Sequence, residues 1–303
     1  MLFFVYVVGA GDDVSIIDTE SNKVVATTTV ADAARGVAVS PDGKQVWVTN
    51  STADSVSVIS TASNVAIGSV QVDRSPSGVV VTPDGRRAYV SNADSNTVSV
   101  IETRMPQKLT GTITLGTNPR GASGLAISPD GKRLYVGHTD SGDVSVINTD
   151  SNTIVTTITG GGASDNAPIV VSPDGKRAYA GHGGSVAVID TASNTVVATV
   201  NGVSASFGAA ITPDGKRVYV SDRISKTVSV IDTATNAVVS TITGLFGPAG
   251  LAVTGDGKSV YVADQDSSHS AGVVRVIDTA SNSVAVTINA QPNPFGVAIG
   301  PPR

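Results

Sequence analysis

Two of the three histidines in this chain, together with two aspartates, stand at one repeated position of the sequence. His138, His182, Asp222 and Asp264 each come three residues after a tyrosine, and the third histidine, His269, follows soon after Asp264. Imidazole titrates near neutral pH, and imidazole beside carboxylate suits a divalent metal. These residue types predict either acid–base catalysis by His138, His182, Asp222 and Asp264, or a divalent metal held by His138, His182 and His269.

The same position carries Gly9, Asn50 and Asn92 in the other copies, which offers a structural alternative. His and Asp are ordinary replacements for Asn at an exposed strand end, where each can hydrogen-bond the next loop. Packed sheets lie about 10 Å apart, whereas zinc ligands must come within about 2.1 Å of the ion. Residues from neighbouring sheets can therefore share a metal only if their side chains point into the funnel and converge there.

This position belongs to a unit that recurs every 42 or so residues, roughly the period of several known repeat architectures. One copy, residues 208–242, holds four short runs rich in Val, Ile, Thr and Tyr. Pro213-Asp214-Gly215 and the Asp-to-Asn stretch 232–236 supply turn residues between the runs. The unit is predicted to be four β-strands. Its strands alternate large with small residues, so both faces should be covered by neighbouring sheets.

Such a unit is typical of a β-propeller blade; a solenoid of strands is the competing architecture, but its repeats are usually shorter. The chain begins inside a blade, because Val5-Tyr6-Val7-Val8 matches a second strand, and it ends on a first strand at 295–300. Six full copies lie between these ends, and pairing the C-terminal strand with the three N-terminal strands would complete a seventh blade and close the ring. The prediction is one all-β domain over 1–303, a seven-bladed β-propeller of four-stranded antiparallel blades.

Composition excludes several classes of protein. Hydrophobic residues make up 40% and charged residues 15%, which fits a globular β protein, and the absence of Cys excludes disulfides and thiolate metal sites. The first eight residues lack a basic region, so no signal peptide is expected. The chain is expected to be a monomer without a membrane span, cytoplasmic as written, with export or cell-surface placement open if it is a mature fragment.

Charge disfavours nucleic acid as a partner. Basic pairs such as Lys132-Arg133 follow the first turns, but the same end of the ring carries turn aspartates, and the net charge is −5. Binding of phosphates needs an unopposed positive field. The aromatic residues also have a structural explanation, because one per blade at a fixed position is typical of core filling. This set comprises Tyr6, Trp47, Tyr89, Tyr135, Tyr179, Tyr219 and Tyr261.

The opposite end, here called the top, carries connections that vary in length and content between copies. Functional residues concentrate on variable loops held by a rigid scaffold, so the top funnel is the candidate site. Three phenylalanines each precede a glycine near the entry to a first strand and are expected at the rim of the channel or in the core. With four polar residues they form the predicted ligand-binding set: Arg35, Arg120, Asp140, Phe207, Arg223, Phe246 and Phe295.

The repeat resembles a known family. Tyr89-Val90-Ser91-Asn92, followed by the strand at 97–102, is similar to the YVTN-type β-propeller repeat. The resemblance covers essentially the whole chain and implies a relation to surface-layer and cell-envelope propellers; one member of that group binds single-stranded DNA. Metal-dependent lactonases and lyases on similar propellers generally employ a Glu in the funnel. Here Glu20 and Glu102, the only glutamates, are expected at the opposite end.

Two functions follow from these observations. The first is a non-catalytic binding scaffold that presents its top funnel to a protein, a glycan or a small ligand. The alternative is a hydrolase or lyase, lactonase-like, in which His138 or His182 acts as general base and Asp222 or Asp264 as its partner or as a metal ligand.

Overall fold

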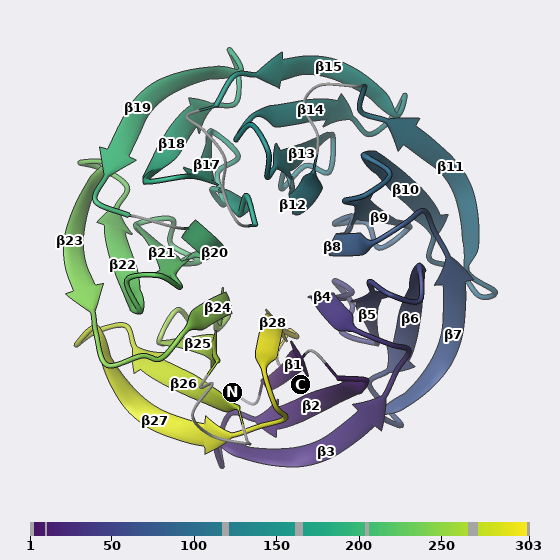
Figure 1. Cartoon of the computed structure of the whole chain (residues 1–303), viewed down its shortest axis with the longest axis horizontal. Coiled ribbons are helices and arrows are strands. Elements are labelled where there is room, and N and C mark those ends of the chain that lie inside the picture. Colours follow the sequence, from purple (N-terminus) through teal and green to yellow (C-terminus); the bar gives the residue numbers. More distant parts are fainter. Residues whose placement is uncertain are drawn as a thin grey trace.

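The protein is a ring of seven antiparallel sheets, each of four strands (Figure 1). The computed structural model describes residues 3–9, 11–116, 121–160, 166–203, 206–265 and 272–301. We number the sheets as blades 1 to 7. Blade 1 has the strand order β28-β1-β2-β3, and each later blade takes four consecutive strands, β4–β7 for blade 2 through β24–β27 for blade 7. The all-β seven-bladed propeller predicted from the repeat is therefore confirmed.

Each blade runs from an innermost strand at the channel to an outermost strand at the rim. The innermost strands are β28 (Pro294–Ile299), β4 (Ala34–Val39), β8 (Pro76–Val81), β12 (Ala122–Ile127), β16 (Ile169–Val171), β20 (Ser206–Ile211) and β24 (Pro248–Val253). The second strands are β1 (Phe4–Gly9), β5 (Gln45–Asn50), β9 (Arg87–Asn92), β13 (Arg133–His138), β17 (Arg177–His182), β21 (Arg217–Asp222) and β25 (Ser259–Asp264). The third strands are β2 (Asp13–Asp18), β6 (Ser55–Ser60), β10 (Thr97–Glu102), β14 (Val144–Asn148), β18 (Ser185–Asp190), β22 (Thr227–Asp232) and β26 (Val273–Asp278). The outermost strands are β3 (Lys23–Thr29), β7 (Val65–Gln71), β11 (Lys108–Thr114), β15 (Thr153–Ile158), β19 (Thr195–Asn201), β23 (Ala237–Ile242) and β27 (Ser283–Asn289).

The two ends of the chain meet in blade 1. Strand β28 pairs antiparallel with β1, with Tyr6 opposite Ala298 and Val7 opposite Val297. One C-terminal strand therefore completes the three N-terminal strands, as the incomplete units at the two ends of the sequence predicted. Closure leaves no unpaired inner strand at this junction, so the ring is continuous.

The turns at the bottom end form as their residues require. Gly43 has φ 69° and Asn64 has φ 55°, in the left-handed region that Gly and Asn tolerate. Hydrogen bonds from the Ser40 hydroxyl and the Lys44 N–H hold the pKa of Asp42 below its ordinary value. The Lys44 ammonium lies 3.7 Å from the same carboxylate, so acidic and basic groups pair on this end.

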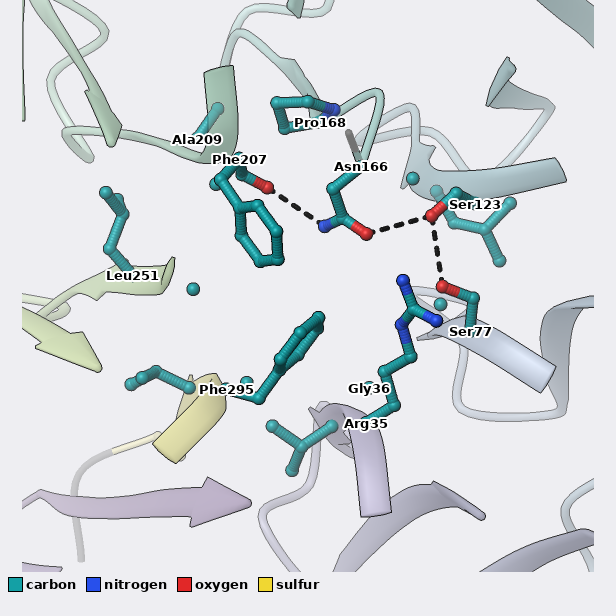
Figure 2. A pocket seen from close by; sticks show the side chains of 18 of the residues that line it. Arg35, Gly36, Ser77, Ser123, Asn166, Pro168, Phe207, Ala209, Leu251 and Phe295 are labelled. Atoms are coloured by element: carbon teal, nitrogen blue, oxygen red, sulfur yellow. Dashed lines mark hydrogen bonds between the residues drawn. The ribbon is translucent and has the colours of Figure 1, made fainter. Parts of the chain in front are cut away.

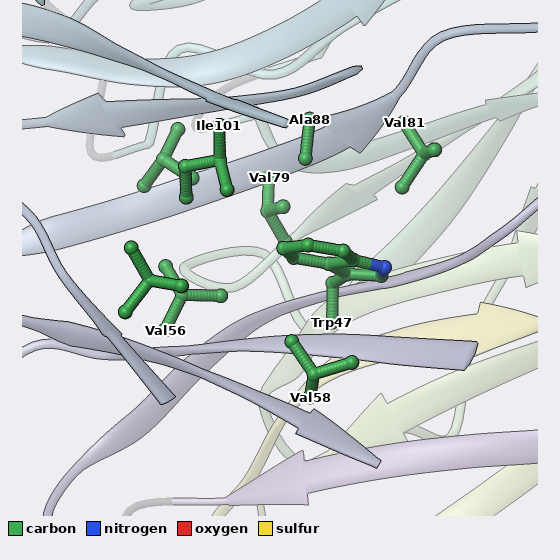
Figure 3. Close-up of a cluster of buried hydrophobic side chains, with 9 residues drawn as sticks. Trp47, Val56, Val58, Val79, Val81, Ala88 and Ile101 are labelled. Carbon is green, nitrogen blue, oxygen red and sulfur yellow. The ribbon is translucent and has the colours of Figure 1, made fainter. Parts of the chain in front are cut away.

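The core lies between neighbouring blades. Trp47 is fully buried and, with Val56 and Val58 of blade 2, packs against Val79, Val81, Ala88 and Ile101 of blade 3 (Figure 3). The six tyrosines at the repeat position of Trp47 are also among the largest buried side chains of the structure. The aromatic position is therefore a core position, as expected from one aromatic residue per blade.

Glycines at the third residue of six of the innermost strands, all except β16, let adjacent blades approach closely at the channel. A Cβ on Gly36 would lie 2.2 Å from the Ser77 carbonyl oxygen of the next blade, and a Cβ on Gly124 would lie 2.1 Å from that of Ala167. Real Cβ atoms do not approach carbonyl oxygens so closely, so these positions require glycine. The residue before each such glycine is thereby held at the wall of the channel.

Candidate functional site

His138, His182, Asp222 and Asp264 finish the second strands of four successive blades, as predicted. All four are buried, with exposed fractions of 0%, 2%, 2% and 0% respectively, so the expectation of an exposed strand end is wrong. Strand alternation places His138 on the same face of β13 as Leu134 and Val136, which pack against blade 3. The four side chains therefore lie within or between the sheets, and none lines the cavities at the channel.

His138 takes the structural place that Asn holds in earlier blades. The Asn92 amide nitrogen donates to Ser99 Oγ at 2.9 Å, across to the third strand of its own blade. In the next blade His138 Nε2 lies 2.9 Å from Ser145 Oγ, at the equivalent position. The imidazole thus replaces the amide in a cross-strand hydrogen bond.

The two aspartates organise the loops above them. Asp264 Oδ1 accepts hydrogen bonds from the backbone N–H groups of Phe246 and Gly247 at 2.9 and 2.8 Å. Its Oδ2 lies 3.1 Å from Arg275 Nε in an ion pair that is almost fully buried. Asp222 Oδ1 accepts from the Ser225 N–H at 2.8 Å, which fixes the turn after β21. Both carboxylates are engaged in holding the fold.

His182 differs from the other three. Within the described part of the chain, neither of its ring nitrogens has a hydrogen-bond partner. The ring lies so close to Gly160 that a Cβ there would be 2.8 Å from His182 Cε1. Burial lowers the pKa of His182 below its ordinary value, and the nearby charge of Asp143 opposes this shift. The neutral imidazole is therefore the form that the fold favours.

The residues suggested as metal ligands do not gather in the described structure. No group of three or more His, Asp or Glu side chains that could hold a metal ion occurs among the residues the structure describes. His269 lies outside these residues, so its place relative to His138 and His182 is not defined. The hypothesis of a divalent metal at the top stays a prediction from sequence.

Replacing His138 and His182 together by Asn should leave the protein folded, because Asn occupies the same register at Asn50 and Asn92. We expect similar melting temperatures for wild type and double variant, and no change in metal content or in turnover of lactones and esters. Calorimetry, elemental analysis of protein purified without chelator, and a substrate screen check this. A folded double variant that has lost bound metal or turnover would show that these imidazoles act in chemistry.

The free energy of unfolding should decrease as the pH is lowered through the range where His182 titrates. Because the folded-state pKa of His182 lies below the unfolded value of about 6.5, its contribution is complete above that pH and is lost as the pH falls through the folded-state pKa. The turn aspartates with shifted pKa values, such as Asp42, are shifted downward and stay charged there. The free energy of unfolding is measured with denaturant from about pH 7.5 to about pH 5.5, roughly one unit either side of 6.5. It should decrease with falling pH in wild type, and His182→Asn should make this dependence weaker. An equally steep pH dependence in the variant would contradict this role of His182.

A cavity of about 390 Å³ opens at the top of the channel, lined by four of the predicted ligand-binding residues. These are Arg35 of blade 2, Phe207 and Arg223 of blade 6, and Phe295 of blade 1. Ala33, Ala34 and Ser51 complete the lining. We call these seven residues the mouth site.

The four large side chains of the mouth site form a continuous series. The Arg35 guanidinium lies 5.1 Å from the centroid of the Phe295 ring. The Phe295 and Phe207 rings meet edge to face, with centroids 4.9 Å apart and planes at 75°. The Arg223 guanidinium lies 5.6 Å from the Phe207 centroid. Two cation–π contacts therefore flank one aromatic pair, an arrangement that presents both positive charge and ring surface.

Below the mouth site, the channel has a polar wall on one side (Figure 2). Ser77 Oγ lies 3.0 Å from Ser123 Oγ, and Ser123 Oγ donates to Asn166 Oδ1 at 3.0 Å. The Asn166 amide nitrogen donates to the Phe207 carbonyl at 2.9 Å. This polar arc links blades 3 to 6, and the cavity beside it is about 160 Å³. In this view Phe295 lies across from Ser123, and the Arg35 side chain is drawn beside Ser77 (Figure 2).

The remaining ligand-binding candidates lie elsewhere. Phe246 is 40% exposed and sits under the Arg275 guanidinium, 5.1 Å from its ring centroid, so it belongs to the Asp264 loop and not to the lining of the mouth site. Asp140 is exposed after β13 and lines neither channel cavity. Arg120 lies outside the described residues. Of the predicted set, four residues are brought together.

Sequence reasoning missed Ser51, Ser77, Ser123 and Asn166. Ser77 and Ser123 stand just before the inner-strand glycines Gly78 and Gly124, the position that Arg35, Phe207 and Phe295 hold in other blades. Comparing that single register around the ring would have selected them. Asn166 offers no such signal, because Ser123 and Asn166 meet only through the curvature of the ring.

Comparisons with known proteins agree with the fold. The family described as "Lactonase, 7-bladed beta-propeller" matches residues 9–103 and 59–173, which together cover more than half of the chain. A second family, the YNCE-like β-propeller, matches 185–300. Among curated proteins, none matches this sequence significantly.

Several solved structures are similar over most of the chain. Hydrazine synthase of Kuenenia stuttgartiensis is 25% identical, with a TM-score of 0.78, and the alignment covers 89% of this chain and 90% of the other. A functionally unknown protein from Desulfotomaculum acetoxidans DSM 771 is 20% identical over 99% of both chains, with a TM-score of 0.84. Dihydro-heme d1 dehydrogenase NirN is 16% identical over 97% of this chain and 74% of its own, with a TM-score of 0.69. The last two likenesses concern the fold alone.

Among the residues that the structure describes, no helix has the length and apolar character needed to cross a bilayer.

Proposed function

We propose, from the premise that this chain belongs to the family of seven-bladed lactonase β-propellers, that it is a non-catalytic binding protein whose mouth site holds a small ligand. The observation that carries the proposal is the series Arg35–Phe295–Phe207–Arg223 around one cavity. A volume of about 390 Å³ lies within the range of small-molecule pockets, roughly 300–1,000 Å³.

The position of the mouth site supports a binding role. It lies at the end of the ring where connections differ between blades, while its residues are held by strands of the rigid scaffold. Phe207 is 3% exposed and packs with Ala249 and Ala263, so one wall of the site is preorganised. Preorganised apolar surface with a few polar groups is the usual composition of a ligand site.

Lactone hydrolysis is the second candidate, and the family match favours it. Such a reaction needs a group that activates water or polarises the carbonyl, supplied by a general base or by metal ligands. Among the described residues that line the mouth site and the channel, none is His, Asp or Glu. The four His and Asp residues predicted as catalytic are buried away from both cavities. Binding is therefore the better-supported function.

An occlusion experiment tests the proposal. Ser51 lines the mouth site, whereas the adjacent Thr52 is exposed and does not. Ser51→Trp should fill the cavity, and Thr52→Trp is the matched control. Compounds of varied charge and shape, including sugars, lactones and esters, are screened for binding by saturation-transfer NMR and for turnover.

We expect compounds that bind wild type and Thr52→Trp but not Ser51→Trp, with no turnover. Finding no compound whose binding depends on Ser51 would overturn the proposal. If wild type turns over a lactone and Ser51→Trp does not, the mouth site would be a catalytic site and not only a binding site.

A further inference from the structure

We infer that the mouth site selects a planar conjugated carboxylate, whose ring lies against Phe295 and whose carboxylate accepts hydrogen bonds from the N–H groups of Arg35 and Arg223. This inference rests on the proposed binding function and names the class of ligand. Three observations support it: the two arginines have no ion-pair partner in the described structure, the two phenylalanine rings meet edge to face, and the side chains of the polar arc are hydrogen-bonded to one another.

The guanidinium of Arg35 has unused donors. Its Nε is buried, and within the described structure that atom has no hydrogen-bond partner. Burial lowers the pKa of Arg35, and the charge of Asp94 partly opposes this, but an arginine stays protonated at neutral pH. Asp94 is exposed, and no ion pair joins it to Arg35 among the described residues. Arg35 is partly buried and lines the cavity, so its charge is incompletely solvated, and a carboxylate in the cavity would offset that cost.

Arg223 adds a second cation at the same cavity. Its guanidinium stands over the Phe207 face and belongs to no ion pair in the described part of the chain. A cation stacked on a ring presents its N–H donors at its edges, where a carboxylate can be bound in two-pronged fashion. The chain as a whole carries a net charge of −5, so this positive mouth is a local feature that favours anions there.

The aromatic pair favours a flat, conjugated body. Phe295 and Phe207 meet at 75°, and a further aromatic ring can make the same kind of edge-to-face or offset-stacked contact. Phe295 is only partly buried, so ring surface remains available to a ligand. Below the rings the channel holds a cavity of about 160 Å³, smaller than the mouth site, which leaves little room for a bulky group.

The polar arc argues against a sugar. Ser77, Ser123 and Asn166 already bond to one another and to the Phe207 carbonyl. Each of the three side chains donates one hydrogen bond within the protein, so they offer few groups for the many hydroxyls of a glycan. The free donors of the site are those of the two arginines, which recognise anions.

The test compares an acid with its neutral isostere. Binding of indole-3-carboxylate, indole-3-carboxamide and inorganic phosphate to the full chain is measured by isothermal titration calorimetry. We expect the acid to bind at least about tenfold more tightly than the amide, because hydrogen bonds to charged groups contribute more than neutral ones. Phosphate, which has charge but no ring, should bind weakly. The preference for the acid should shrink as salt is raised.

Variants assign the preference to the site. Arg35→Gln and Arg223→Gln should each reduce acid binding toward that of the amide, with a smaller effect on amide binding. Arg74→Gln removes the same charge from another exposed position on a top connection and should change neither. Arg223 is exposed, so its variant keeps the test valid if Arg35→Gln does not fold.

Each outcome decides between the two proposals. Equal binding of acid and amide would overturn the carboxylate class while leaving a binding function in place. Phosphate as tight as the acid would overturn the requirement for a planar ring. Failure of all three probes to bind overturns the ligand class, and the Ser51→Trp screen then decides separately whether the mouth site binds anything.

Discussion

Removal of residues 294–303 is expected to leave the protein aggregated or largely unfolded at room temperature. The deletion takes away β28 and with it the ladder to β1. Val5 and Val7 are fully buried and pack in a cluster that includes Val297 and Ile299, so their apolar surface would meet water. Burial of one large aliphatic side chain stabilises by about 1.5–3 kcal/mol. Loss of several approaches the whole stability of a typical domain, about 5–15 kcal/mol.

Circular dichroism, size-exclusion chromatography and thermal unfolding measure this effect. A synthetic peptide of residues 290–303 added to the truncated protein should restore a cooperative transition. The same peptide with Val297→Asp and Ile299→Asp should not, because both side chains face the buried cluster. An unchanged melting temperature of the truncated protein would contradict closure by these two strands.

Replacing Asp264 by Ala is expected to destabilise the protein by about 3–5 kcal/mol, the range found when one partner of a buried ion pair is removed. Asp264 is fully buried, and its loss leaves the Arg275 charge and two backbone N–H groups without their acceptor. Asp140→Ala, at an exposed carboxylate, is the matched control and should change stability by less than about 0.5 kcal/mol.

A double variant separates the structural role from a catalytic one. Adding Arg275→Leu to Asp264→Ala should recover part of the stability, because the uncompensated charge is removed. Urea unfolding gives all four free energies of the cycle. If Asp264→Ala were as stable as wild type and had lost an activity, Asp264 would be a functional residue and not an anchor of its loop.

Much of the fold could be predicted from local residue chemistry repeated along the chain. Glycine and asparagine fix the bottom turns through positive φ, as at Gly43 and Asn64. The incomplete units at the two ends required closure by β28 and β1, since either alone would leave an open sheet edge. Each of these inferences concerns neighbours in sequence or copies of one unit.

The candidate site was only partly predictable. Strand alternation could have shown that His138 shares a face with Leu134 and Val136 and is directed toward the neighbouring blade. Phe207 and Phe295 were selected from their position before an inner-strand glycine, but their contact across blade 7 depends on the curvature of the closed ring. Such contacts between distant strands leave no periodic signal in sequence.

The outermost strands show a further limit of composition. Val25, Val197 and Val239 are at least half exposed, although β3, β19 and β23 contain the same β-branched residues as the buried strands. Residue type alone favours a β-strand, but it does not determine whether a neighbouring sheet covers a face of that strand. Order within the blade, and not composition, determines which strands lie at the rim.

The measurement that tests the account most directly is a crystal structure of the protein soaked with indole-3-carboxylate. The account predicts density for one molecule at the mouth site, with its carboxylate within hydrogen-bond distance of Arg35 and Arg223 and its ring against Phe295. Density confined to the bottom end, or a mouth site left empty while calorimetry shows binding, would contradict it.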